Sequence, residues 1–92
     1  MRYVILNGAA VKSRGELYDA LEAHLGLPDY FGRNLDALHD VLLHEILPAG
    51  PLTLEIEDFG ALRANLGEYA VGLRHMLADA ARDDRKLTVV LR

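Results

Sequence analysis

The most informative stretch of the chain is residues 28–44, Pro28-Asp29-Tyr30-Phe31-Gly32-Arg33-Asn34-Leu35-Asp36-Ala37-Leu38-His39-Asp40-Val41-Leu42-Leu43-His44. A proline and a glycine bracket two aromatic residues near its start, which predicts a loop. Asn34 then stands where a helix N-cap belongs, because its side-chain oxygen can accept hydrogen bonds from the first free backbone N–H groups. Leucines at positions 35, 38 and 42 follow with helical spacing, so a short helix with one apolar face begins here.

Two aspartates occupy another face of this predicted helix. Asp36 and Asp40 are four residues apart and are therefore neighbours, which costs an isolated helix about 0.2–0.5 kcal/mol. Residues 29–45 contain four acids and one base, a net charge of −3, whereas the whole chain carries −4. The simplest interpretation is a solvated polar face, since charged residues are mostly exposed. Aromatic residues beside this charge are typical of an interface, so the pattern also predicts a surface for a cationic partner.

The composition predicts one globular domain spanning residues 1–92, because 92 residues leave no room for a second core. A pI near 5.4 argues against direct nucleic-acid binding and suits a basic protein partner. The chain has no cysteine, which fits a reducing compartment. Its first apolar run is too short for a signal peptide, and no stretch approaches the ~18 residues of a membrane span. We expect a cytoplasmic protein that does not enter a membrane.

The N-terminal part predicts a strand and a helix ahead of the central stretch. Residues 3–6 are almost all apolar and stop at Asn7-Gly8, as expected of a central, buried strand. Ser13 and Glu16 have the spacing of a capping box, and Gly26 marks the end of the helix that follows. The predicted inward positions of this helix are Leu17, Leu21, His24 and Leu25, so we expect His24 to pack in the core.

The C-terminal part predicts two strands and two helices. Pro48-Ala49-Gly50-Pro51 is a loop, and residues 52–56 alternate apolar and polar side chains, as in a strand with one wet face or at an edge. Asp58 is placed to cap a helix over 59–66, and a longer helix over 68–82 precedes an apolar strand at 87–91. The inward stripe of the longer helix comprises Tyr69, Leu73, Met76, Leu77 and Ala80.

This order of elements predicts an α/β fold. Helices between successive strands imply parallel pairing with right-handed crossovers. The expected architecture is a single two-layer domain, a three-stranded parallel sheet with about four helices packed on one face. The order of the strands within the sheet does not follow from the pattern.

The residues favour no catalytic, metal or cofactor site. His39 and His44 are five apart rather than the four that place two ligands on one helical face, and no cysteine completes a zinc site. The only serine, Ser13, has a simpler role as a cap, and His75 is expected at the surface. A general acid/base pair of Asp36 and Asp40 remains an alternative, although no pocket is evident around it.

The run Leu27-Pro28-Asp29-Tyr30-Phe31-Gly32-Arg33-Asn34-Leu35-Asp36-Ala37-Leu38, followed by Asp40, resembles the signature of the barstar family of ribonuclease inhibitors. The order of elements on both sides is similar as well. The resemblance implies sequential strand order 1-2-3 and a cis peptide bond at Gly50-Pro51. It also implies a function, binding and blocking a basic, barnase-type ribonuclease, with the inhibitor free as a monomer and without a cofactor. A barstar-like module for another cationic protein is the alternative.

The resemblance also assigns roles to individual residues. Asp40 matches the aspartate that occupies the phosphate site of the ribonuclease, Asp36 matches a second acid facing the cleft, and Tyr30 matches the aromatic that stacks on the catalytic histidine. Asp79 stands where the family has a peripheral glutamate, with Asp83 as a weaker candidate. The full predicted partner-binding set is Tyr30, Gly32, Asn34, Leu35, Asp36, His39, Asp40, Leu43 and Asp79.

Three departures from the best-known member bear on which partner is bound. His39 replaces a tryptophan, which removes contact area and introduces a residue type that changes charge near neutral pH. Phe31 replaces a second tyrosine. The segment 44–50 is longer and lacks an aromatic residue.

Overall fold

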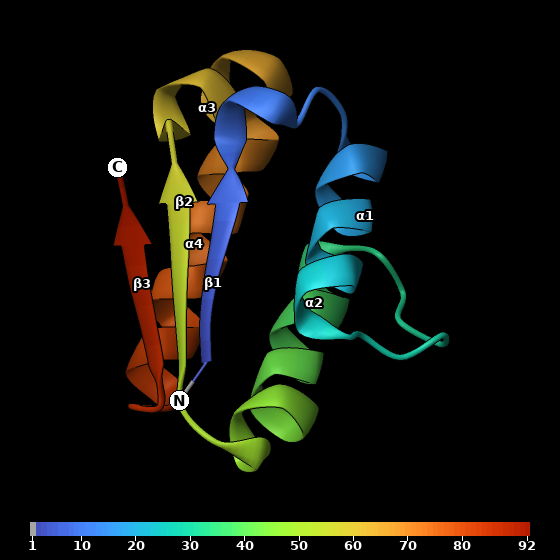
Figure 1. Cartoon of the computed structure of the whole chain (residues 1–92), viewed down its shortest axis with the longest axis vertical. Helices are drawn as coiled ribbons and strands as arrows, with labels where there is room; N and C mark the ends of the chain where they lie inside the picture. The colour runs from blue at the N-terminus through green and yellow to red at the C-terminus, as the bar shows by residue number, and fades with distance from the viewer. Residues whose placement is uncertain (1) are drawn as a thin grey trace.

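The structure, a computed structural model that describes residues 2–92, contains a three-stranded parallel sheet. The strands lie side by side in the order β1-β2-β3 (Figure 1). Their bounds are Arg2–Asn7 for β1, Leu52–Glu57 for β2 and Leu87–Leu91 for β3. The predicted α/β class is confirmed, as is the sequential order that the family resemblance implied.

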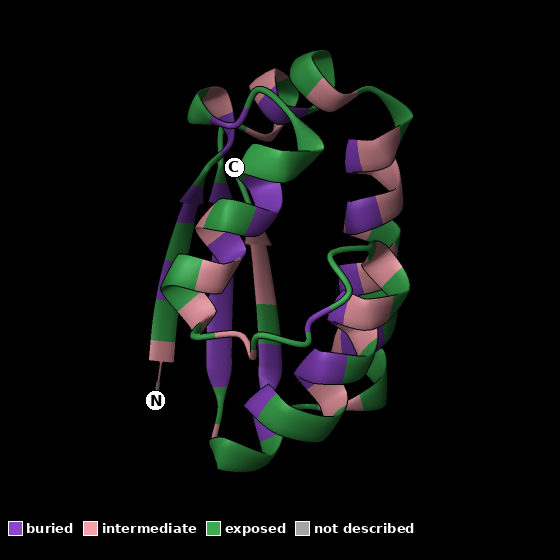
Figure 2. Cartoon of the chain, turned by 90° about the vertical axis from the view of Figure 1, so that its right-hand side faces the viewer, coloured by how far each residue is buried: buried purple, intermediate pink, exposed green. Residues whose placement is uncertain are grey.

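Four α-helices of the described chain pack on one face of this sheet and form a second layer (Figures 1 and 2). Their bounds are Arg14–Leu25 for α1, Leu35–Val41 for α2, Phe59–Leu66 for α3 and Glu68–Asp83 for α4. Single turns connect them to the strands, the 3-10 turns η1 (Gly8–Ala10) and η3 (Leu47–Ala49) and the π turn η2 (Leu42–Ile46).

The core lies between the sheet and the helices, because alternate residues of each strand face the helical layer. Tyr18 is the largest fully buried side chain. Its hydroxyl forms a hydrogen bond with that of Tyr69, and its ring packs edge-on against Phe31 at 5.6 Å between centroids. This contact draws the loop after α1 into the core. Other buried residues that make up the core include Val4, Leu6, Leu17, Leu21, Leu38, Leu42, Leu54, Ile56, Leu73 and Leu77.

The predicted environments of the first two strands were wrong. β1 is an edge strand, and its Tyr3 and Ile5 side chains are 57% and 44% exposed on the open face of the sheet. β2 is the central strand, and its residues Thr53 and Glu55 are each only 7% exposed. Glu55 accepts a hydrogen bond from the Tyr3 hydroxyl of β1 and pairs with Arg92, the residue after β3, at 3.2 Å. These two side chains cover a residue that the alternation placed in water.

The helix caps follow the prediction with one exception. The Ser13 hydroxyl accepts from the backbone N–H of Glu16 at 3.1 Å, and Gly26 ends α1 in the left-handed conformation, as expected. Asp58 precedes α3 but makes no side-chain capping bond. Its backbone is left-handed (φ 53°) rather than extended, the conformation that N-cap residues usually adopt.

Two further expectations were wrong. His24 is exposed, because α1 is buried through Leu17, Tyr18 and Leu21, a stripe that leaves position 24 outside the core. No peptide bond of residues 2–92 is cis, so the Gly50-Pro51 bond is trans.

Candidate functional site

The helix α2 is held between the core and α4 by its own apolar residues. Leu38 and Val41 are buried, and Leu35 lies so close to α4 that a Cβ atom on Gly72 would come within 3.1 Å of its Cδ1. The predicted cap is present, since the Asn34 Oδ1 accepts from the backbone N–H of Ala37 at 2.8 Å. These contacts fix the outward face of α2 relative to the rest of the fold.

The two predicted aspartates lie on that outward face. Asp36 is exposed, and the Asp40 side chain is 77% exposed. Within residues 2–92, neither carboxylate forms an ion pair with a lysine or arginine. Two carboxylates on a rigid, capped helix therefore remain available to a cation from outside the chain.

His39 lies between two carboxylates of this surface. Its Nδ1 is 3.9 Å from Asp40 and its Nε2 is 3.7 Å from Asp83 at the end of α4. Both distances are too long for a hydrogen bond. Each contact is an ion pair only when the imidazole is protonated. The sequence indicated Asp83 as a weaker candidate, and the fold brings it beside His39.

A hollow of about 330 Å³ separates α2 from the loop before it. Tyr30 stands at this hollow with 75% of its surface exposed, and its hydroxyl donates a hydrogen bond to Glu45. That hydrogen bond raises the pKa of the Tyr30 phenol. Phe31, in contrast, is buried, so only one of the two aromatic residues is available to a partner. The lining residues are Tyr30, Phe31, Gly32, Ala37, Asp40, Val41, His44 and Glu45.

A second hollow, of about 430 Å³, separates α2 from α4 on the other side. It brings together four predicted site residues, Leu35, Asp36, His39 and Asp79, with Gly72, His75 and Met76. Asp79 pairs with Arg82 on its own helix, so its charge is partly compensated, unlike that of Asp36. The sequence analysis did not include His75 in the site, although its spacing of four residues from Asp79 placed both on one face of α4.

Two other predicted site residues, Gly32 and Leu43, do not line this second hollow. Gly32 is exposed, and a Cβ atom there would lie 3.2 Å from the Cβ of Ala37, so the loop passes close to the first turn of α2. Leu43 is partly buried against the core and lines neither of the two hollows beside α2.

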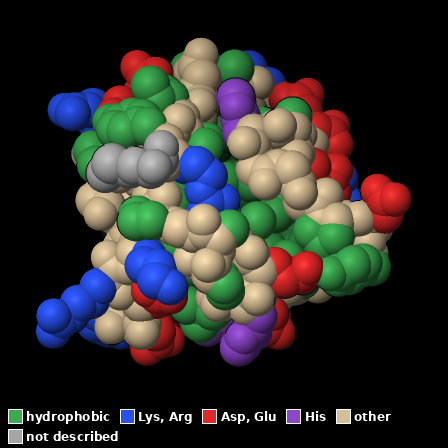
Figure 3. Space-filling model, turned by 60° about the horizontal axis from the view of Figure 1, so that its bottom comes forward, with side chains coloured by type: hydrophobic (Ala, Val, Ile, Leu, Met, Phe, Trp, Pro, Cys, Tyr) green, Lys and Arg blue, Asp and Glu red, His purple; other side chains and the backbone are tan. Residues whose placement is uncertain are grey.

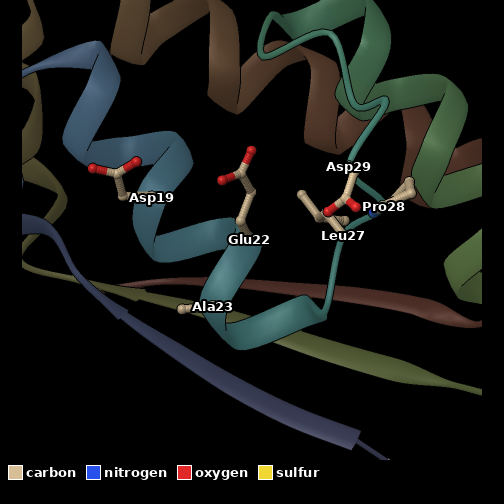
Figure 4. A pocket seen from close by; sticks show the side chains of 6 residues that line it. All are labelled: Asp19, Glu22, Ala23, Leu27, Pro28 and Asp29. Carbon is tan, nitrogen blue, oxygen red and sulfur yellow. The ribbon is translucent and has the colours of Figure 1, made fainter.

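A third hollow, of about 470 Å³, lies between α1 and the loop. Figure 4 shows the side chains around it, with Asp19 and Glu22 on α1 and Asp29 on the loop. The sequence analysis did not include Asp19 and Glu22 in the predicted site. In Figure 3, red side chains follow one another along the right-hand edge of the molecule, the side on which Figure 1 shows α1, and others lie at the left and at the bottom.

The fold and this surface define a class of protein, a small two-layer α/β domain that presents uncompensated carboxylates on a short, capped helix. Within residues 2–92 no group of three or more His, Asp or Glu side chains is arranged to hold a metal ion. No helix of the described chain combines the length and apolar character needed to cross a membrane.

Comparison with known proteins assigns the chain within this class. A family model described as "Barstar (barnase inhibitor)" matches residues 1–92. A protein of Bacillus subtilis (strain 168) named "Putative ribonuclease inhibitor YrdF" is 36% identical over 83 residues, which cover 90% of this chain and 89% of that protein. The chain belongs to the barstar family.

Proposed function

We propose that this protein binds a basic ribonuclease of the barnase type and blocks its active site with α2 and the loop before it. The observation that carries the proposal is the pair Asp36 and Asp40, exposed on a capped helix without a lysine or arginine partner among residues 2–92. An active site that holds RNA phosphate presents Arg, Lys and His side chains. A carboxylate preset at the phosphate position accepts charge-assisted, partly bidentate hydrogen bonds from such groups.

The two hollows beside α2 suggest how the roles are divided. Asp40 takes the phosphate position, and Tyr30 at the first hollow packs against the catalytic histidine of the ribonuclease. Asp36 and Asp79 face a peripheral cation across the second hollow. Because Arg82 competes with the ribonuclease for Asp79, Asp79 contributes less to the binding affinity than Asp36 does. His39 beside Asp40, in place of a tryptophan, adjusts which ribonuclease fits.

The proposal includes a biological setting. The protein acts as a monomer in the cytoplasm and protects the cell that makes the ribonuclease. It performs no catalysis of its own. Its net charge of −4 attracts a basic enzyme over a distance, which speeds association and makes it sensitive to salt.

The test is an RNA-cleavage assay with barnase as the probe, together with measured binding rates. Asp40→Ala removes one partner of a desolvated charge pair, which costs about 2–5 kcal/mol, or roughly 30-fold or more in Kd. Glu57→Gln is the matched control, because it removes one exposed negative charge at the end of β2, away from α2. It should leave Kd nearly unchanged. Association of the wild-type protein should slow markedly as salt is raised.

The outcomes separate the proposal from its alternatives. An Asp40→Ala variant within about tenfold of the wild-type Kd (~1.4 kcal/mol) would show that this carboxylate does not replace a phosphate. A protein that binds barnase without slowing RNA cleavage would instead be an interaction module. A rate of association that does not depend on salt would contradict steering by charge.

A further inference from the structure

The loop that carries Tyr30 is tied to α1 by the side chain of Arg33. The Arg33 Nη2 donates to the backbone oxygen of Gly15 at 3.0 Å and to Asp19 Oδ1 at 2.9 Å, and its Nη1 donates to Glu22 Oε1 at 2.7 Å. The three acceptors follow one another at intervals of four and three residues and so lie along one face of α1. The planar guanidinium fork can satisfy all three together, which a lysine ammonium does less well.

Arg33 is the second of two anchors that hold this loop on α1. Two residues earlier, Phe31 packs into the core against Tyr18. The Arg33 Cζ lies 6.0 Å from the centre of the same Tyr18 ring, at the outer limit of a cation–π contact. The anchors flank Gly32, with Tyr30 directly before the first of them and Asn34, the cap of α2, directly after the second.

The backbone at Arg33 also indicates a special role. Its φ is 53°, in the left-handed region that glycine adopts readily and other residues rarely do. Such a conformation persists at a non-glycine residue when the surrounding contacts determine it, and such positions cluster at functional sites. Here the contacts made by the guanidinium provide those constraints.

The same contacts direct the charge of Arg33 away from α2. Arg33 is the only lysine or arginine in residues 29–45, yet its ion pairs in the described chain are with Asp19 and Glu22 rather than with Asp36 or Asp40. The hydrogen bond to Asp19, followed by that to Glu22, raises the pKa of the guanidinium. The acids of α1 are thereby partly neutralised, and those of α2 are not.

From these contacts we infer that Arg33 is a positioning residue, which clamps the loop of residues 27–34 onto α1 and so presets Tyr30 and the start of α2 for the partner. This inference rests on the proposed ribonuclease-binding function. A loop that is already ordered does not have to be ordered on binding, and that cost would otherwise lower the affinity. The Arg33 guanidinium itself need not touch the partner.

The test compares Arg33→Gly with Arg63→Ala. Glycine tolerates the left-handed backbone, so Arg33→Gly removes the clamp without straining the fold. Arg63→Ala makes the same change of net charge at an exposed position of α3, and Arg63 has no ion pair within residues 2–92. Either change makes the chain more negative, which alone favours a basic partner. Loss of the clamp weakens binding, so in Arg33→Gly the charge change and the loss of the clamp alter the affinity in opposite directions.

Two measurements are needed, one on the free protein and one on the complex with barnase. The backbone N–H of Phe31, which donates to the oxygen of Pro28 at 3.0 Å, reports on the loop through its hydrogen-exchange rate. In Arg33→Gly we expect this rate to rise at least tenfold, with the amides of β2 unchanged, and Kd for barnase to weaken at least tenfold. Arg63→Ala should match the wild type in exchange and bind at least as tightly. The double variant Asp19→Ala, Glu22→Ala, which keeps Arg33 but removes both of its side-chain acceptors, should raise the Phe31 exchange rate as Arg33→Gly does.

Several results would overturn the inference. One is binding of Arg33→Gly that is as tight as that of Arg63→Ala, and another is a Phe31 exchange rate in Arg33→Gly that stays at the wild-type value. Weaker binding without faster exchange would make Arg33 a direct contact rather than a positioning residue. Failure of the wild-type protein to bind barnase would overturn the proposed function instead, and the exchange rate of Phe31 would then decide by itself whether Arg33 clamps the loop.

Discussion

The capping of α2 by Asn34 gives a prediction that connects stability with binding. The Asn34 side-chain oxygen accepts a hydrogen bond from the backbone N–H of Ala37 at 2.8 Å. The Asn34 backbone oxygen accepts a second one from the backbone N–H of Leu38 at 2.9 Å. The variant Asn34→Ala removes the first bond and keeps the second. Because α2 has only seven residues, its first turn carries both Leu35 and Asp36, and loosening that turn moves the binding surface.

The expected magnitude follows from the type of bond that is lost. Replacing an asparagine cap by alanine costs about 0.5–2 kcal/mol, typically ~1 kcal/mol. Asn34 is exposed, so water can reach the freed N–H group and the cost should stay near the middle of that range. For a domain of this size, ~1 kcal/mol corresponds to a fall in Tm of about 4–8 °C.

The assay is thermal unfolding followed by circular dichroism, combined with Kd for barnase. Asn34→Asp keeps an acceptor and adds an anion at the positive end of the helix, so its stability should be close to that of the wild type. Asn65→Ala is the matched control, because it removes another asparagine hydrogen bond, from Nδ2 to the backbone oxygen of Val11 at 3.0 Å. It should lower Tm by a similar amount and leave Kd unchanged.

Two results would refute this reasoning. A Tm for Asn34→Ala within about 1 °C of the wild type would mean that the cap does not hold α2 in place. Equal weakening of binding by Asn34→Ala and Asn65→Ala would mean that affinity follows the overall stability rather than the order of α2.

Two further predictions concern the core. Gly8→Ala places a Cβ atom 2.6 Å from the backbone oxygen of Glu57 and 2.7 Å from that of Asp58, and should lower the free energy of unfolding in urea by about 3 kcal/mol. Gly60→Ala, whose Cβ would meet no atom within 4 Å, should not lower the free energy of unfolding. An equal loss of stability in the two variants would contradict the predicted clash at Gly8. Burial, and then the hydrogen bond to Tyr69, raise the pKa of Tyr18 above the ordinary value of 10.0, so its contribution to stability is present below pH 10 and is lost as the pH rises further. Tyr18→Phe should therefore lose less stability than the wild type between pH 9 and pH 11.5, and identical pH profiles would exclude this role.

Features that depend on residues three or four positions apart could be predicted from the sequence. The caps at Ser13 and Asn34 and the helix end at Gly26 are examples, because each is formed by atoms that lie within one turn of each other. The exposure of Asp36 and Asp40 on one side of α2 belongs to the same group, since the helical period and the leucines on the opposite face determine it.

The burial of the strands could not be predicted in the same way. Whether Ile5 or Glu55 is covered depends on which strands flank each one and on whether a second layer lies over that face of the sheet. The structure leaves Ile5 exposed on an edge strand and covers Glu55 with Tyr3 of β1 and with Arg92, which directly follows β3. His24 was misplaced for a related reason, because the path of α1 past β1 decides which of its apolar stripes is buried.

The sequence by itself determined that this protein has three parallel strands, helices between them and a capped acidic helix, because local spacing encodes those features. Only the tertiary structure decided that Arg33 binds α1 rather than the aspartates that follow it, and that Asp79 and His75 of α4 share a hollow with Asp36. These contacts join residues 11–43 positions apart. They exist because the core brings α1, α2 and α4 together, and no local pattern in the chain specifies that arrangement.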